Sequence, residues 1–139
     1  MTEGSALAGA LDTEHAAVYA YGVLGARLDD ATRRAAQTAS DAHRSRRDDL
    51  LSAMRARGLP TPGPASSYDV LVTDRPQALA LAVRVETEVG VRWRDLVAAT
   101  DDRALRRLAV QALQDSAVRA ALWRRAAGTT PATVALPGA

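Results

Sequence analysis

The chain has 139 residues, a formal net charge of +2 and no cysteine. This length is typical of one domain with a core large enough to fold without metal or disulfides, and the missing cysteine excludes a disulfide framework, a thiolate metal site and a cysteine nucleophile. The first ten residues lack the basic region with which a secretory signal peptide begins. No apolar run approaches the roughly 20 residues of a membrane span. We therefore expect one domain, residues 1–139, in the cytoplasm and without a membrane partner.

Arginine is the only strongly basic residue type, and the chain also lacks Ile, Phe and Asn. Together with abundant Ala, Arg, Val, Leu, Gly and Asp, this bias is typical of a high-GC bacterial genome. Aspartates interrupt the arginines throughout, and no set of aromatic residues offers a surface on which nucleic-acid bases could stack. We therefore expect a solvated surface of mixed charge and no nucleic-acid partner.

The first helix is predicted over residues 5–28, with Ser5 as its N-cap. Its inward line recurs every three or four residues, which is the spacing of a helix packed against partners. That line includes an acid and a tyrosine: Leu7, Leu11, Glu14, Val18 and Tyr21. A buried carboxylate is costly unless it is paired, hydrogen-bonded, protonated or bound to a metal. Glu14 therefore requires partners from other helices.

The second helix is predicted over residues 31–57, after the possible caps Asp29 and Asp30 and before Gly58, which ends it. Its inward line is polar in the middle: Ala36, Ser40, His43, Arg47, Leu50 and Met54. Residues 58–74 are rich in Pro and Ser and cannot be helical. A loop of this length needs a structural reason, and an extended chain can travel the full length of a bundle. We therefore predict a long crossover.

The third helix is predicted over residues 75–99, with Asp74 as an acidic cap and Pro76 in the first turn. Glu86 and Trp93 fall on its inward line. The fourth helix is predicted over residues 102–127. We expect its inward line to be polar near the middle: Leu105, Leu108, Ala112, Asp115, Arg119 and Leu122. The tail, residues 128–139, is expected to pack loosely or to be mobile.

Short, long and short connections make the second and third helices parallel, which is the topology of ferritin-like folds. The predicted fold class is therefore all-α, a ferritin-like four-helix bundle with a long crossover loop between helices two and three. A plain up-down-up-down bundle with a slack loop is the alternative. At 1.5 Å per residue, the inward polar residues of all four helices fall within about 6 to 8 Å along the bundle, in one polar layer.

Two kinds of chemistry suit such a layer. A di-iron or di-manganese centre takes a Glu from each of two helices and a Glu-x-x-His pair from each of the other two. The candidate metal ligands are Glu14, His43, Glu86 and Asp115. Ser40 stands where a glutamate paired with His43 would be, and the fourth helix has no histidine, so at most half of the ligand set is present.

The alternative is a buried ion network in which arginines supply the positive charge, with tyrosine hydroxyls completing the hydrogen bonds. Its predicted members are Glu14, His43, Arg46, Arg47, Glu86, Asp115 and Arg119. We favour this network over an occupied metal site. We expect the arginines of the second helix to neutralise Glu14.

Other polar and aromatic residues of the helices suggest weaker sites. His15 points about 100° away from Glu14 around the helix, toward a flank rather than the polar layer. A possible small-molecule pocket would be lined by His15, Tyr19, Tyr21 and Trp93. Gly22 and Gly25 indicate close approach of a helix, either in a homodimer or inside the monomer. No nucleophile elbow, phosphate loop or metalloprotease spacing is present, so we assign no catalytic residue.

Several of these residues resemble a ferritin-like domain family of unknown function from high-GC bacteria. The resemblance covers nearly the whole chain. It lies in Glu14-His15-Ala-Ala-Val-Tyr19-Ala-Tyr21-Gly22, His43-Arg-Ser-Arg46-Arg47-Asp48, Glu86, Trp123-Arg124 and Leu136-Pro137-Gly138. It implies a four-helix ferritin-like fold and brings no established activity. Relative to iron-storing and oxygen-activating ferritin-like proteins, the chain departs at Ser40 and throughout the ligand motif of the fourth helix.

The sequence therefore favours a binding or interaction module with a degenerate, non-catalytic di-iron-type site, no cofactor and a homodimeric assembly. The alternative is a metal-binding protein or oxidoreductase that holds iron or manganese in the bundle core. The identity of a protein or small-molecule partner cannot be obtained from the sequence.

Overall fold

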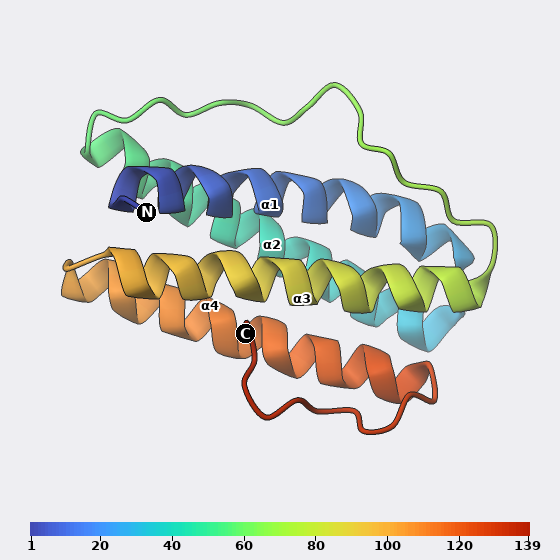
Figure 1. Ribbon diagram of the computed structural model, residues 1–139. Coiled ribbons are helices and arrows are strands. Elements are labelled where there is room, and N and C mark those ends of the chain that lie inside the picture. The colour runs from blue at the N-terminus through green and yellow to red at the C-terminus, as the bar shows by residue number, and fades with distance from the viewer.

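The computed structural model describes residues 1–139, which form four long helices and no strand (Figure 1). They are α1, Glu3–Leu24, continued by the short 3-10 turn η1, Gly25–Arg27; α2, Asp30–Ala56; α3, Arg75–Ala99; and α4, Arg103–Ala126. The predicted all-α four-helix bundle is confirmed. None of these helices combines the length and the apolar character that crossing a bilayer requires.

Side-chain caps set where the helices begin. Asp29, Asp74 and Asp102 each accept hydrogen bonds from backbone N–H groups in the first turn of α2, α3 and α4. The helix α1 begins earlier than predicted, because Thr2 is its N-cap and Ser5 completes a reciprocal capping box with it. Gly58 follows the end of α2 with a φ of 65°, a conformation that glycine adopts without strain.

The connection between α2 and α3 runs the full length of the bundle, so these two helices are parallel (Figure 1). The helix α1 packs against α2 and α3, and α3 packs against α4, whereas α2 and α4 touch little. Two contacts hold the crossover to α1: His15 Nε2 lies 3.2 Å from the Pro62 carbonyl oxygen, and the rings of Tyr19 and Tyr68 are 5.1 Å apart. The crossover is therefore seated on the bundle.

The inward line of α4 keeps the predicted Leu105 and Ala112, but its other positions lie one residue later than predicted. Its buried residues are Leu105, Ala109, Ala112, Ser116, Ala120 and Trp123. Leu122 is 54% exposed, and the Asp115 side chain is 52% exposed. The line of small residues lets α4 approach its neighbour closely, while the leucines cover its flanks. The prediction that Asp115 lies in the polar layer is therefore wrong.

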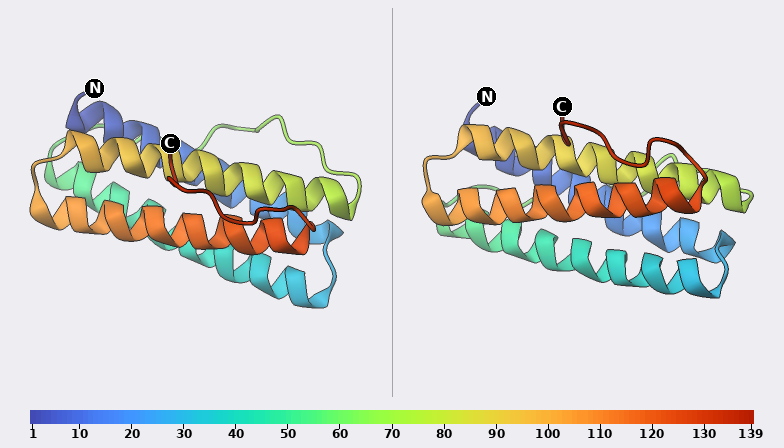
Figure 2. Two further views of the ribbon diagram at one scale, coloured as in Figure 1. Left: turned by 60° about the horizontal axis from the view of Figure 1, so that its bottom comes forward. Right: turned by 90° about the horizontal axis from the view of Figure 1, so that it is seen from below.

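The C-terminal segment, residues 128–139, folds back along α3 and α4 (Figure 2). Arg124 donates hydrogen bonds to the Ala132 carbonyl and the Thr87 hydroxyl, both at 3.4 Å. Gly138 has a φ of 82°, and a Cβ atom there would lie 3.0 Å from the Gly90 carbonyl oxygen. The end of the chain is therefore closely packed against α3, in contrast to the loose packing expected from its composition.

Candidate functional site

His43 occupies the centre of the bundle and is completely buried. Its Nδ1 lies 2.6 Å from Glu14 Oε2, and its Nε2 lies 2.9 Å from Glu86 Oε1. A neutral imidazole donates at only one nitrogen, so two carboxylate partners require the protonated ring. Burial alone would lower the pKa of His43, but hydrogen bonds to Glu14 and Glu86 and their negative charges raise that pKa to about 9. His43 is therefore an imidazolium at neutral pH.

Glu14 is satisfied without any arginine. Its second oxygen, Oε1, accepts a hydrogen bond of 2.7 Å from the indole nitrogen of Trp93 on α3. The prediction that an arginine of the second helix neutralises Glu14 is wrong. Arg47 pairs with Asp48 at 2.9 Å, and Arg46 pairs with Asp115 at 2.8 Å.

The two arginines are outside the network because of their length and hydration. Both side chains are partly exposed, and each reaches a carboxylate at the surface. The shorter His43 side chain stays within the bundle, where its ring spans the distance between two acids. The polar layer is thus neutralised on α2 by histidine alone.

Glu86 on α3 has all its hydrogen-bond partners on one oxygen. Its Oε1 accepts from His43, from the Tyr21 hydroxyl at 2.5 Å and from Arg119 Nε at 3.0 Å. Burial would raise the pKa of Glu86, but the hydrogen bond and charge of His43, with the charge of Arg119, lower it below its usual value. Glu86 is therefore a carboxylate, and the structure places Arg119 on it. Its Oε2 is buried and has no hydrogen-bond partner.

Tyr21 and Trp123 extend the network toward α4. The Tyr21 hydroxyl donates to Glu86 and accepts a hydrogen bond of 2.8 Å from the Trp123 indole nitrogen. Its ring stacks on that of His43, with centroids 5.4 Å apart. Burial and the negative charge of Glu86 raise the pKa of Tyr21 well above its usual value. Tyr21 therefore keeps its proton and acts as a hydrogen-bond donor.

The predictions did not include Trp123 in the network and treated Trp93 as a core or pocket residue. A signal was available, because a buried indole N–H usually needs an acceptor. Trp93 lies seven positions after Glu86, and Trp123 four positions after Arg119, so each shares a helix face with a charged residue. The pairing with Glu86 marks Trp93 as a residue of the polar layer, whereas Arg119 offers no acceptor, and the partner of Trp123 is the Tyr21 hydroxyl.

The charges of the network balance within the core. Glu14 and Glu86 contribute two negative charges, and His43 and Arg119 contribute two positive charges, so the sum is zero. Of the four candidate metal ligands, the structure brings Glu14, His43 and Glu86 together and places Asp115 at the surface. No group of three or more His, Cys, Asp or Glu side chains is arranged to hold a metal ion.

The structure separates into two groups the four residues predicted to line a small-molecule pocket, His15, Tyr19, Tyr21 and Trp93. Tyr21 and Trp93 are buried in the network, whereas His15 and Tyr19 contact the crossover. None of the four lines the cavity beside Glu86 and Leu113 or the one beside Gly9 and Arg92. The reason is helical phase, because His15 and Tyr19 point toward a different side of α1 from Tyr21.

Comparisons with known proteins agree with this fold. A family model described as a domain of unknown function, DUF4439, matches residues 6–139. The crystal structure of a conserved hypothetical protein, rv2844, from Mycobacterium tuberculosis is similar at a TM-score of 0.87 and 36% sequence identity, covering 97% of this chain and 96% of that chain. No curated protein matches. Since the family model spans nearly the whole chain, the protein belongs to the DUF4439 family.

Proposed function

We propose that the protein is a ferritin-like binding or interaction module whose di-iron-type site has been replaced by a charged network. The observation that carries this proposal is the position of His43, whose two ring nitrogens both face carboxylates of the core. A ring in this state has no lone pair for a metal. The long crossover and the parallel α2 and α3 support the ferritin-like assignment, since that topology is typical of the class.

The network is better suited to holding the bundle together than to catalysis. A general acid or base must reach its substrate and works best with a pKa near the working pH. His43 is completely buried, is hydrogen-bonded at both nitrogens and has a pKa of about 9. Each helix of the bundle contributes at least one member, so the network fixes the relative positions of all four.

The alternative is a metal-binding protein, since Glu14, His43 and Glu86 are ligand types that iron and manganese accept. The test is metal analysis of the chain purified without chelator from cells supplied with iron and manganese. We expect far less than one metal ion per chain, both in the wild type and in Glu14→Ala. Stoichiometric metal that is lost in Glu14→Ala and kept in Asp115→Ala would overturn the proposal.

We further propose that the module is a homodimer that meets its copy through Gly22 and Gly25. A Cβ atom built at either glycine meets nothing within 4 Å, so packing inside the monomer does not require glycine there. Light scattering after size-exclusion chromatography should give a dimer mass for the wild type and a monomer mass for Gly22→Arg. Gly63→Arg, in the equally open crossover, is the matched control and should stay dimeric. A monomeric wild type would contradict this assignment.

A further inference from the structure

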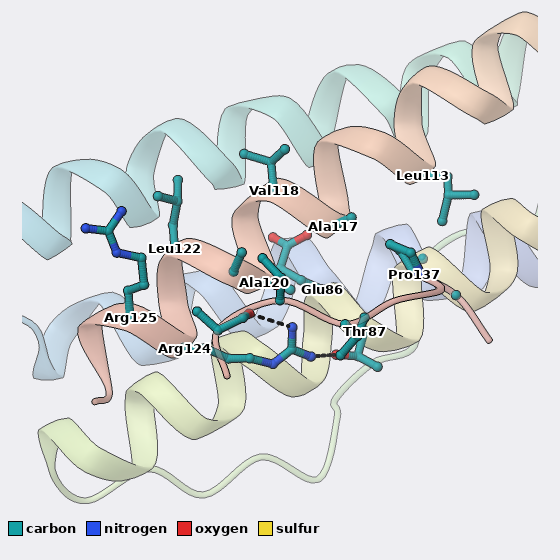
Figure 3. Close-up of a pocket in the computed structure, with 16 residues that line it drawn as sticks. Glu86, Thr87, Leu113, Ala117, Val118, Ala120, Leu122, Arg124, Arg125 and Pro137 are labelled. Carbon is teal, nitrogen blue, oxygen red and sulfur yellow. Dashed lines mark hydrogen bonds between the residues drawn. The ribbon is translucent and has the colours of Figure 1, made fainter. Parts of the chain in front are cut away.

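A cavity of about 380 Å³ lies between α3, α4 and the C-terminal segment (Figure 3). Its wall is largely apolar and includes Leu113, Ala117 and Ala121 from α4 and Val134 and Pro137 from the C-terminal segment. Glu86 of the charged network is also part of this wall. The volume falls within the range of about 300 to 1,000 Å³ that is typical of small-molecule sites.

The wall formed by the C-terminal segment is held in place by specific contacts. Arg124 bonds to the Ala132 carbonyl and to Thr87 on α3, as the dashed lines in Figure 3 show. At the other end, Gly138 packs so closely on Gly90 that even a Cβ atom would crowd the Gly90 carbonyl oxygen. These contacts fix the C-terminal segment against α3 and α4, so the cavity beneath it is a defined part of the fold.

Glu86, which lines the cavity, has one buried oxygen without a partner. Glu86 is 1% exposed, and three donors from three different elements converge on its Oε1, while its Oε2 receives none. An acceptor buried without a donor costs free energy, and more so when it is charged. A ligand donor that reaches this oxygen from the cavity would satisfy it.

The charges around the cavity indicate that this donor is neutral. The carboxylates of the network are already balanced by His43 and Arg119. Arg124 and Arg125 also line the cavity, and neither is within salt-bridge distance of a carboxylate. An ammonium group would therefore meet Arg124 and Arg125, and a carboxylate would meet Glu86.

We propose that this cavity binds a neutral, mainly apolar small molecule whose hydroxyl group donates a hydrogen bond to Glu86 Oε2. The inference rests on the proposed function, because it names the class of ligand that the binding module would take. No bond forms or breaks in this step, and the network keeps its protons. The apolar body of the ligand would lie along Leu113, Ala117 and Ala121.

The test is an NMR titration of the full chain with two candidate ligands that are isomers of equal size. The probes are 1-octanol and methyl heptyl ether, which have the same atoms but differ in the hydroxyl donor, with octylammonium and heptanoate as charged counterparts. We expect 1-octanol to bind about ten-fold or more tightly than the ether, as a hydrogen bond to a charged acceptor implies. It should shift the amide resonances of Thr87 and Gly90 and the carboxyl carbon of Glu86.

Equal binding of the alcohol and the ether, tighter binding of either charged probe, or no binding at all would overturn the inference. Ala121→Leu fills the cavity and should weaken 1-octanol binding about ten-fold or more. Ala104→Leu makes the same change on an exposed part of α4 outside the cavity and should leave binding unchanged. If the protein is metal-free and does not bind 1-octanol, only this inference is wrong. If the protein holds stoichiometric metal, the proposed function itself is wrong.

Discussion

At the scale of single residues, the network depends on matching each acid to a donor of the right length. Glu14 receives one donor from His43 and one from Trp93, so both its oxygens are satisfied. Because these partners are buried with it, loss of either donor leaves a charged acceptor that water cannot readily reach. The stability of the fold should therefore be more sensitive to these donors than to any surface ion pair.

Trp93→Phe removes the indole N–H and leaves Glu14 Oε1 without its donor. We expect the free energy of unfolding to fall by about 1 to 3 kcal/mol more than in Trp123→Phe, whose N–H bonds to the neutral Tyr21 hydroxyl. The two substitutions remove the same volume, so the difference isolates the charged acceptor. Urea denaturation of both variants gives the comparison, and an equal or larger loss in Trp123→Phe would contradict it.

The sequence allowed four of the network's acids and bases to be predicted. Glu14, His43 and Glu86 stand on apolar lines of regular spacing, and Arg119 lies at the matching height on α4. The pairing could not be predicted, because it depends on side-chain length and on competing surface carboxylates. Arg46 shows this most clearly, since Asp115 lies within its reach outside the core.

At the scale of secondary structure elements, the crossover is held by aromatic and polar contacts along α1. Tyr68 packs on Tyr19, and its hydroxyl accepts a hydrogen bond of 3.1 Å from the Ala65 amide. Leu71, three residues further on, is 83% exposed and offers chymotrypsin an accessible bond. Cleavage there therefore reports how firmly the crossover is seated.

Tyr68→Ala should accelerate chymotrypsin cleavage after Leu71 several-fold. The variant lacks the contact with Tyr19 that must break when the crossover opens, so local opening costs less free energy. The midpoint of global unfolding should change little, since the crossover contributes few buried residues. Asp69→Ala, on the exposed side of the same segment, is the control and should leave the cleavage rate unchanged. If Tyr68→Ala and Asp69→Ala are cleaved at the same rate, the contact does not hold the loop.

Helix ends were more predictable than helix phase. Asp29 and Asp74, both predicted as caps, act through short local hydrogen bonds that the sequence makes visible. The phase of α4 is harder to predict, because leucines on its flanks give a stronger apolar pattern than the alanines that face the core. Ala109 and Ser116 are buried through close helix approach, which only the tertiary structure defines.

At the scale of the whole molecule, the network makes stability depend on pH in a defined direction. The pKa of His43 is about 9 in the folded chain and near 6.5 when unfolded, so the folded state binds more protons between these values. The stability that protonated His43 contributes is complete below pH 6.5 and is lost as the pH rises through 9. Glu86, whose pKa is lowered, has the opposite dependence and loses its contribution under acid conditions, below pH 4.5.

The free energy of unfolding should therefore fall by roughly 3 kcal/mol between pH 6.5 and pH 9, which corresponds to the shift of the His43 pKa. Urea denaturation at several pH values measures this change. The groups that face His43 are Glu14, Glu86 and Tyr21. The pKa of Glu86 is lowered and that of Tyr21 is raised, so neither of these two loses a proton in this range. His43→Gln should be less stable, and its free energy of unfolding should not fall between pH 6.5 and pH 9. An equal fall in that variant would show that another group causes the pH dependence.

A protonated His43 holds the two acids of the core together. NMR of the chain with nitrogen-15-labelled histidine, followed from pH 6 to pH 10, measures this protonation. Both ring nitrogens of His43 should carry hydrogen at neutral pH, and the ring of the folded chain should titrate near the pKa of about 9. A neutral ring at pH 7, or a ring nitrogen with the shift of a metal ligand, would contradict it.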